Sequence, residues 1–404
     1  MSANDPSPSH LLYADCPDVD LGAYAEIDLD ALCHNFRLIR DRVHPASPVA
    51  VVKAEAYGHG ATAVIRALAG EGCDHFAVAS LREALEARAV LRSIGAAGDV
   101  MILGFSDPAE SALLAEAELI RTVLSESDAL ALQEQAARAD VTVRVQVALD
   151  TGMHRIGLPL YNGEEAADAL ARILCLPNLR TVGLFSHLSR ADEPSGGSGA
   201  LRTAEQIALF DRFLSLLKTR GISLPTVHLF NSAASLTRPP RAGEWARVGL
   251  ALYGVSPAAE AALPLRPVMR LVSRVVHLQQ LRAGDEVGYG GRYVAPSDRT
   301  LATLSIGYAD GLPQPRRGIR VELLTKNGSV LCPLVGRVCM DQCMVDVTGA
   351  DVRIGDRVIL FGSEAAPLSA YALGAELSAY ECLTLVSGRV RRFHFHSSTE
   401  VSAQ

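Results

Sequence analysis

Short apolar runs alternate with amphipathic segments from residue 23 to about residue 255. Eight of these runs are strand-like, namely VAVVKA (49–54), HFAVAS (75–80), VMILG (100–104), LIRTVL (119–124), VRVQVALD (143–150), TVGLFSH (181–187), TVHLFN (226–231) and VGLALYG (248–254). The segments between them, such as LREALEARAVL (81–91), have apolar residues three and four positions apart, which predicts helices. Strands that are apolar on both faces and are each followed by a helix favour a parallel sheet covered by helices.

The number of strands distinguishes between two α/β folds. Eight strands over about 230 residues fit a (β/α)8 barrel of the TIM type, whose usual size is about 250 residues. A doubly wound open sheet is the alternative, but no G-x-G-x-x-G turn follows the first strand, so a dinucleotide site has no support. The pattern therefore predicts a TIM-type barrel.

The pattern changes after about residue 260. Strand-like runs such as LVSRVVHLQQL (271–281) and DRVILFG (356–362) are separated by Gly, Asp, Asn and Pro, and helical spacing returns only near residues 368–386. This pattern of strand-like runs and turn residues predicts a second, mostly β domain. We expect a flexible leader at 1–22, the barrel at 23–260, the β domain at 261–396 and a tail at 397–404.

Composition and charge narrow the class of protein. The chain has 404 residues, of which 49% are hydrophobic, and a formal charge of −7 without a basic cluster, so nucleic acid is not an expected partner. No apolar run reaches the length of about 18 residues that a membrane helix needs. The N-terminal segment does not have the pattern of an export signal, and the eight cysteines are scattered, so we expect free thiols, a cytoplasmic location and no metal site.

Lys53 is the first candidate for chemistry, because functional side chains of a barrel lie at the carboxyl ends of its strands. It ends an apolar run within VVKAEAYGHG. Partial desolvation lowers the pKa of a lysine and prepares a neutral amine for Schiff-base chemistry. The alternative interpretation is a lysine that extends to solvent at the barrel rim. Tyr57 and His59 follow directly, and together these residues resemble the floor of a site.

Further candidates follow the later strands. They are Arg155 after the fifth strand, His187 at the sixth, Asn231 and Ser232 after the seventh, and Arg247 and Gly249 at the eighth. Phosphate sites of barrels commonly form after strands seven and eight, which suggests a phosphorylated ligand. Each residue also has a purely structural interpretation, such as a core histidine, a surface ion pair or a helix cap.

Three motifs of the second domain, VGYGGRY (287–293), SIGYADG (305–311) and GRVCMDQCMVD (336–346), are by themselves typical of hairpin turns with packed tyrosines. Together with KAEAYGHG, DTGMHRIG, HLFNSAA and RVGLALYG they form an ordered set that resembles the alanine racemase family. These are pyridoxal-phosphate enzymes with a barrel followed by a β domain. The resemblance runs from AEIDLDALCHN (25–35) to VSGRVRR (386–392), nearly the whole chain.

The resemblance implies a role for each candidate. Lys53 would bind pyridoxal 5′-phosphate and act as acid or base on the D-face of the substrate, and Tyr289 of the other subunit of a homodimer would act on the L-face. The cofactor would also be held by Tyr57, His187, Asn231, Ser232, Arg247, Gly249 and Tyr380, with Arg247 facing the pyridine nitrogen. The substrate would contact Arg155 and Met340, while His228 would support the hydrogen-bond network, and Tyr308 and Asp341 would line the access path from the partner subunit.

The implied reaction interconverts L-alanine and D-alanine and supplies D-alanine for peptidoglycan. It needs two bases on opposite faces and an electron sink, which the cofactor provides. A broad-specificity or serine-acting racemase of the same architecture is the close alternative. A non-catalytic pyridoxal-phosphate carrier is the alternative from another class, but such carriers lack a second domain with a paired tyrosine.

Two positions depart from the pattern of the family. Ala148 stands where many relatives carry a carbamylated lysine that pairs with the arginine corresponding to Arg155, so we expect a bound anion such as chloride, or another acidic side chain, to compensate Arg155. Glu55 replaces the usual Asn or Asp.

The breadth of substrates stays open. Tyr380 favours alanine as the substrate, whereas SHLSRAD with MHRIG resembles relatives that also accept serine.

Overall fold

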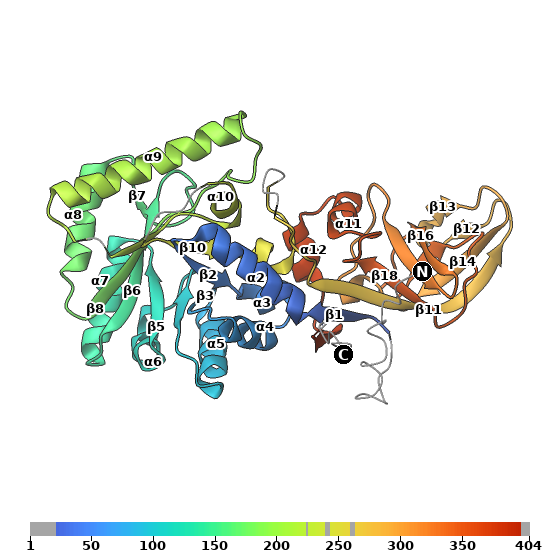
Figure 1. Cartoon of the computed structure of the whole chain (residues 1–404), viewed down its shortest axis with the longest axis horizontal. Helices are drawn as coiled ribbons and strands as arrows, with labels where there is room; N and C mark the ends of the chain where they lie inside the picture. The colour runs from blue at the N-terminus through green and yellow to red at the C-terminus, as the bar shows by residue number, and fades with distance from the viewer. Residues whose placement is uncertain (1–21, 224, 239–242, 259–262, 397–404) are drawn as a thin grey trace, which may run out of the picture. The chain divides into compact units, whose positions relative to one another are not determined.

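The computed structural model describes residues 22–223, 225–238, 243–258 and 263–396 (Figure 1). The predicted tail at 397–404 and all of the predicted leader except Gly22 lie outside these residues. Contacts divide the described chain into two compact units. The barrel unit comprises residues 32–56 and 60–266, and the β unit comprises residues 22–31, 57–59 and 267–396.

Eight parallel strands form the core of the barrel unit. In spatial order they are β10 (Trp245–Val248), β2 (Ser47–Val51), β3 (His75–Val78), β4 (Asp99–Ile102), β5 (Leu119–Val123), β6 (Val143–Asp150), β8 (Leu179–Phe185) and β9 (Thr226–His228). A parallel bridge between Val227 and Glu244 links β9 to the segment just before β10, so the ring is nearly closed. The short strand β7 (Leu158–Pro159) pairs with β6. This topology confirms the predicted (β/α)8 barrel.

Helices follow the strands and cover the barrel on the outside (Figure 1). They are α4 (Ala61–Gly70), α5 (Leu81–Ser93), α6 (Ser111–Glu116), α7 (Glu126–Arg138), α8 (Gly163–Leu174), α9 (Ser198–Thr219) and α10 (Ser232–Thr237), with most of α2 (Leu29–Val43) and the 3-10 turn η1 (Pro108–Glu110). Each of the helices α5, α7 and α8 begins at a side chain that caps its first turn, provided by Ser80, Ser125 and Asn162.

The run 248–254 is not the strand that its apolar residues predict. Strand β10 ends at Val248, and the rest forms the buried 3-10 helix η2 (Leu250–Tyr253). A short apolar run fits a buried helix as well as a buried strand, and periodicity cannot separate them. The first and seventh strands are also shorter than predicted, because β2 ends at Val51 and β9 at His228.

The β unit is built on eight strands, and its mostly β character confirms the prediction. They are β1 (Tyr24–Asp28), β11 (Met269–Leu281), β14 (Arg299–Leu304), β15 (Arg320–Thr325), β16 (Gly328–Val335), β17 (Cys343–Asp346), β18 (Arg357–Phe361) and β19 (Arg391–Phe395). Because β14 pairs with both β17 and β11, six of the strands close into a ring. Two short strands, β12 (Glu286–Val287) and β13 (Tyr293–Val294), and two helices, α11 (Leu368–Ala375) and α12 (Ala379–Leu385), complete the unit.

The strand nearest the start of the described chain belongs to this sheet. β1 pairs antiparallel with β11 and parallel with β19, more than 240 residues further along the chain. Between these strands, Glu26 is buried and forms ion pairs with Arg270 and Arg357. The local pattern around residue 26 gives no sign of these distant partners.

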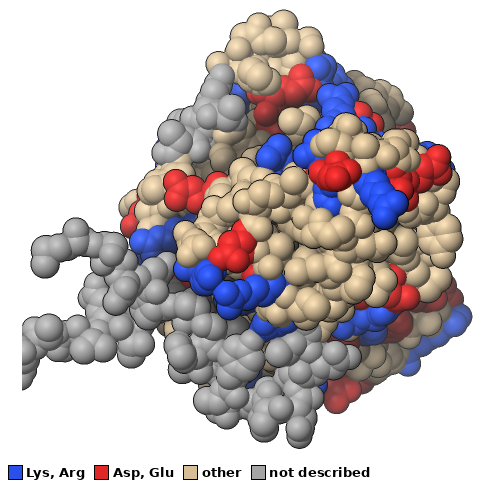
Figure 2. All heavy atoms as spheres, turned by 90° about the vertical axis from the view of Figure 1, so that its right-hand side faces the viewer, with Lys and Arg blue, Asp and Glu red and all other residues tan. Residues whose placement is uncertain are grey.

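None of the described helices is long and apolar enough to cross a membrane. On the face drawn in Figure 2, basic and acidic side chains are scattered among uncharged residues.

Candidate active site

A strained turn carries Lys53 at the carboxyl end of β2. The strand stops at Val51, and the segment α3 (Lys53–Gly58) turns in the left-handed sense, with φ between 52° and 55° at residues 54–57. This conformation costs L-residues about 1–2 kcal/mol each. Strained backbone is concentrated at functional sites, where the surrounding structure holds it in place.

Glu83 holds the start of this turn. Its Oε1 accepts a hydrogen bond of 2.7 Å from the backbone N–H of Ala54, and its Oε2 accepts from the N–H groups of Ala79 (2.7 Å) and Ser80 (3.2 Å). One carboxylate therefore caps α5 and fixes the backbone next to Lys53. Glu83 is not among the candidates predicted from the sequence, although the S-x-x-E spacing of residues 80–83 is the signal of such a cap.

Four basic side chains at this end of the barrel affect one another's pKa values electrostatically, namely Lys53, Arg155, His187 and Arg247. Burial lowers the pKa of Lys53, the positive charge of Arg155 lowers it further, and the carboxylate of Glu83 opposes both effects. Among the described residues, the Lys53 amine has no hydrogen-bond partner. Burial, followed by the charges of Arg247, Arg155 and Lys53, lowers the pKa of His187 to about 3, so its imidazole is neutral at physiological pH.

Arg247 is a buried cation held by the ends of two other strands. Its Nη1 donates to His228 Nδ1 (2.7 Å) and to the His228 carbonyl (2.9 Å), and its Nη2 donates to the Ser186 carbonyl (2.7 Å). Burial, followed by the charge of Arg155, lowers the pKa of Arg247 to about 9, so the group remains a cation near neutral pH.

His228 is a neutral hydrogen-bond acceptor. Burial, followed by the charge of Arg247, lowers its pKa well below the ordinary value. Since Nδ1 accepts from Arg247, the proton of the neutral ring is assigned to Nε2, which is buried without a hydrogen-bond partner in the structure. The ring stacks on Phe185 with 5.1 Å between the ring centres.

The loops after β9 and β10 meet as the sequence predicts. Asn231 Oδ1 accepts from the N–H of Ala234 (3.1 Å) and caps α10, while the Ser232 hydroxyl accepts from the N–H of Gly249 (2.8 Å). Two short helices, α10 and η2, therefore begin side by side. Backbone N–H groups at helix starts favour anions such as phosphate.

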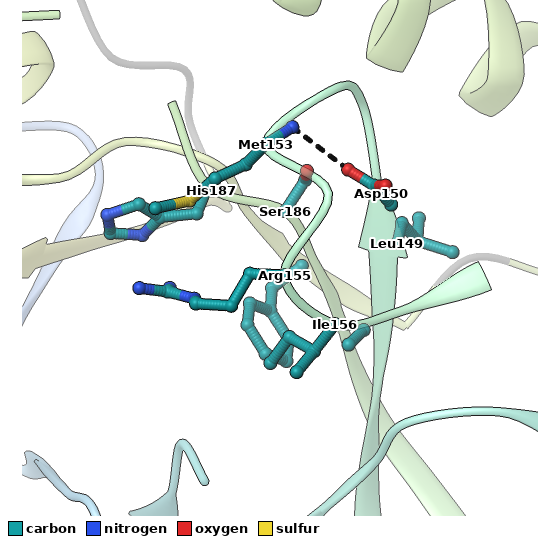
Figure 3. Close-up of a pocket in the computed structure, with 9 residues that line it drawn as sticks. Leu149, Asp150, Met153, Arg155, Ile156, Ser186 and His187 are labelled. Atoms are coloured by element: carbon teal, nitrogen blue, oxygen red, sulfur yellow. Dashed lines mark hydrogen bonds between the residues drawn. The ribbon is translucent and has the colours of Figure 1, made fainter. Parts of the chain in front are cut away.

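A small pocket lies beside Arg155 (Figure 3). It is lined by Ala148, Leu149, Asp150, Met153, Arg155, Ile156, Phe185, Ser186 and His187, and its volume of about 10 Å³ is the room of one water-sized particle. The side chains of Arg155 and His187 point to the same side of it. Among the described residues, no carboxylate forms an ion pair with Arg155, so the proposed compensation by an acidic side chain finds no support there.

Tyr57 and Tyr380 lie together in the β unit, with 5.9 Å between their ring centres. Burial raises the pKa of Tyr57, so its hydroxyl remains a neutral donor. Directly after Tyr57, the chain passes very close to α12. A Cβ on Gly58 would lie 2.5 Å from the Leu383 carbonyl oxygen, and φ of Gly58 is +81°. Only glycine fits at this position.

The β unit also brings Tyr308, Met340 and Asp341 together. The N–H of Tyr308 donates to the Cys339 carbonyl (3.0 Å), the N–H of Ala309 donates to the Met340 carbonyl (3.0 Å), and Asp341 forms an ion pair with Arg389 at 2.9 Å. Tyr289 lies at the start of the 3-10 turn η3 (Tyr289–Gly291) and is 70% exposed. Tyr308 and Met340 are 50% and 53% exposed.

The barrel unit thus gathers one set of candidates and the β unit gathers the other. The first set is Lys53, Arg155, His187, His228, Asn231, Ser232, Arg247 and Gly249, and the second is Tyr57, Tyr289, Tyr308, Met340, Asp341 and Tyr380. No group of three His, Cys, Asp or Glu residues that could hold a metal occurs within the described ranges. A desolvated lysine at the carboxyl end of one barrel strand and two helix starts in the loops after two others are features typical of barrel enzymes that bind phosphorylated ligands.

Comparison with known proteins specifies this class. Residues 27–257 match the model of the alanine racemase N-terminal domain, and residues 268–394 match that of the alanine racemase C-terminal domain. The chain belongs to the alanine racemase family.

Individual alanine racemases are similar to this chain over nearly its full length. Alanine racemase of Clostridium novyi (strain NT) is 35% identical over 389 residues, which cover 94% of this chain and 97% of that protein. The solved structure of alanine racemase from Clostridium difficile 630 has a TM-score of 0.84 at 32% identity and covers 94% of this chain and 97% of that one. Alanine racemase from Streptomyces coelicolor A3(2) also has a TM-score of 0.84, at 34% identity, and covers 94% and 99%.

Proposed function

We propose that this protein is a pyridoxal-phosphate-dependent racemase that interconverts L-alanine and D-alanine and supplies D-alanine for peptidoglycan. Membership of the alanine racemase family supports the reaction. The observation that carries the proposal is the amine of Lys53, whose pKa is lowered and which stands on a strained turn beside Arg155.

The residues present fit pyridoxal phosphate. The Lys53 amine has no described partner and would bind the aldehyde carbon. Ser232 and Gly249 join the starts of α10 and η2, whose first N–H groups would hold a phosphate. Tyr57, with a neutral hydroxyl, and Tyr380 would add donors, while Asn231 and His187 would fix the surrounding loops. Bound there, the cofactor would supply an electron sink that acidifies the α-proton of an amino acid.

Two residues would move the proton. Lys53 would accept or return it on the D-face, and the lowered pKa provides more neutral amine near pH 7 than an ordinary lysine has. Tyr289 would act on the L-face, and its exposure in the β unit leaves the hydroxyl open to a partner surface.

Arg247 would restrict the chemistry at the ring nitrogen of the cofactor. A guanidinium donates hydrogen bonds but cannot accept one, so a ring nitrogen that faces it is kept unprotonated. The neutral His228 and the carbonyl of Ser186 hold Arg247 in one orientation. We infer that the resulting weaker electron sink suppresses side reactions such as transamination.

Arg155 and Met340 would contact the substrate, and Tyr308 and Asp341 would line the access path. Since Ala148 has no charge and no described carboxylate pairs with Arg155, we propose that a small anion such as chloride lies beside Arg155. The pocket there has the room of about one water-sized particle.

We further propose a homodimer in which each active site takes residues from both subunits. Exposed aromatic and apolar side chains at Tyr289, Tyr308 and Met340 support this arrangement, because clusters of such residues are typical of protein interfaces. The cytoplasm is the proposed location, and the seven described cysteines are all free, as is usual in reducing compartments.

Two alternatives share the barrel and its lysine. A broader or serine-acting racemase stays open, because the comparisons do not separate substrates within this architecture. The non-catalytic carrier has no support from the relatives, which are named as racemases.

The test is direct. The purified protein should be yellow, borohydride should bleach the colour irreversibly, and polarimetry should show conversion of L-alanine to D-alanine. L-serine and L-arginine, tested in parallel, measure the breadth of substrates. A colourless protein that neither binds added pyridoxal phosphate nor racemises alanine would contradict the proposal.

A further inference from the structure

A second hollow of about 260 Å³ lies in the barrel unit and shares no residue with the candidate active site. Most of its lining residues come from the loop after β8, the first turns of α9 and the end of α10. Its lining residues are Arg190, Ala191, Asp192, Glu193, Pro194, Ser195, Ala200, Thr203, Thr237, Arg238 and Ala258.

The charged side chains of this hollow are only partly paired. Arg190 forms an ion pair with Glu193 and donates a 2.9 Å hydrogen bond to the hydroxyl of Ser198. In contrast, the side chains of Arg238 and Asp192 have no ion pair or hydrogen bond with any other described residue. One positive and one negative group therefore remain available in the same hollow.

Thr203 supplies an independent observation. It is 1% exposed and lines the hollow, and its hydroxyl has no hydrogen-bond partner in the structure. Buried hydroxyl groups in proteins are nearly always hydrogen-bonded, so an unpaired one beside a cavity points to a group that the cavity receives.

We propose that this hollow binds a free amino acid as a zwitterion, with its carboxylate toward Arg238 and the Thr203 hydroxyl and its ammonium group toward Asp192. The available charges cancel, which suits a ligand with one charge of each sign. A phosphate or a dicarboxylate would place uncompensated negative charge beside Asp192 and Glu193. The choice of alanine as the ligand rests on the proposed function, whereas the complementarity to a zwitterion does not.

The experiment uses enzyme whose bound cofactor has been reduced with borohydride, so that the cofactor is fixed at the candidate active site. Calorimetric titration with L-alanine should show saturable binding, and Arg238→Ala should weaken it at least ~10-fold through the loss of a charged contact. Arg212→Ala, which removes an exposed arginine of α9 that does not line the hollow, should bind like the wild type. Equal affinity in Arg238→Ala, or no saturable binding by the wild type, would overturn the proposal.

A second comparison tests the zwitterion. The wild type should bind L-alanine at least ~10-fold more tightly than propionate, which lacks the ammonium group, and Asp192→Asn should lose this preference. If propionate binds equally well, the site is not one for a zwitterion. Thr203→Val, which keeps the volume and removes the hydroxyl, should weaken binding ~3-fold or more without changing the circular dichroism spectrum.

The two proposals fail in different ways. If borohydride neither bleaches the enzyme nor blocks activity, the proposed function fails, and titration of the untreated enzyme and its Arg238→Ala variant still tests the hollow. If the cofactor is present but Arg238→Ala has no effect on binding, only the second site is wrong.

Discussion

At Lys53 the surroundings change the chemistry of an ordinary side chain. Burial disfavours the charged ammonium form, the guanidinium of Arg155 disfavours it further, and only Glu83 acts in the opposite direction. The pKa is therefore lowered, and the neutral amine, which is both a nucleophile and a base, becomes available at lower pH than in a free lysine.

Replacing Lys53 by Ala should abolish racemisation, with a loss of at least ~100-fold, and should remove the visible absorbance of the bound cofactor. The measurement is an absorbance spectrum with a polarimetric assay. Lys218→Ala is the control, because Lys218 lies exposed in the last turn of α9. An unchanged spectrum in the Lys53 variant would exclude this lysine as the attachment site.

Replacing Tyr289 by Phe removes only the proposed L-face hydroxyl. We expect the rate of conversion from L-alanine to fall by ~100-fold or more, while the visible absorbance stays at the wild-type level, because the ring stays in place. Tyr161→Phe, at another exposed tyrosine, should retain full activity. Normal rates in both directions for Tyr289→Phe would remove this residue from the mechanism.

At the scale of elements, the left-handed turn after β2 needs external support. Its four residues with positive φ cost about 4–8 kcal/mol in sum, at about 1–2 kcal/mol each. The hydrogen bond from Ala54 to Glu83 couples this turn to the start of α5, so the cap of one helix positions the lysine of a neighbouring strand.

Replacing Glu83 by Gln should loosen this turn, because an amide –NH2 group cannot accept the N–H bonds that the carboxylate accepts. We expect cofactor affinity to fall by ~10-fold or more, corresponding to about 1.5 kcal/mol or more. With D-alanine as substrate Lys53 is the base, so the acidic limb of the pH–rate profile should also move to lower pH, since Glu83 raises the pKa of Lys53. Glu86→Gln on the exposed side of α5 is the control, and a Glu83 variant with unchanged cofactor affinity and pH profile would contradict the positioning role.

At the other end of the barrel strands, Asp99 contributes to stability. Although burial alone raises its pKa, the neighbouring His75 and the guanidinium of Arg144, 2.7 Å away, lower it from 3.8 to about 2. The depressed value means that the stabilisation is fully present above about pH 4 and is lost as the pH falls toward 2. The shift corresponds to about 2 kcal/mol.

Asp99→Asn should therefore lower the free energy of unfolding by about 2 kcal/mol at pH 7 and should flatten its pH dependence between about pH 4 and 2. Urea unfolding at a series of pH values measures both effects. The control variant is Asp74→Asn, because Asp74 is exposed and lies directly before β3. An equal pH dependence in the wild type and Asp99→Asn would show that the ion pairs do not act as described.

At the scale of the whole molecule, the candidate residues are divided between two units, and several in the β unit are exposed. The exposed fractions of Tyr289, Tyr308 and Met340 are 70%, 50% and 53%. A partner subunit that places Tyr289 beside another chain's Lys53 would complete both sites of a symmetric dimer.

Co-expression of Lys53→Ala and Tyr289→Phe chains tests this sharing. A mixed dimer would have one site in which both residues are intact, so random pairing should restore about one quarter of the wild-type activity. Each variant expressed alone should stay inactive. Absence of any recovery, with mixed dimers shown by differential tags, would count against sites built from two chains.

Which loops of the candidate site meet could be predicted, because barrels place functional residues after strand ends and the sequence places those ends to within a few residues. Ser232 and Gly249 meet as expected for that reason. Glu83 was missed because its contact with Ala54 joins segments 29 residues apart. The 3-10 helix at 250–253 was also missed, because an apolar run shows that a segment is buried but not how its backbone turns.

The amino-acid sequence by itself determined the order of strands and helices, the change to a β domain and the identity of the candidate residues, since these depend on local spacing and on side-chain chemistry. Only the tertiary structure decided the left-handed turn at Lys53, the lowered pKa values of Lys53 and His187, and the joining of β1 to the second sheet. The physical reason is that strain, desolvation and pairing depend on atoms from distant parts of the chain, and their energies exist only when folding brings those atoms together.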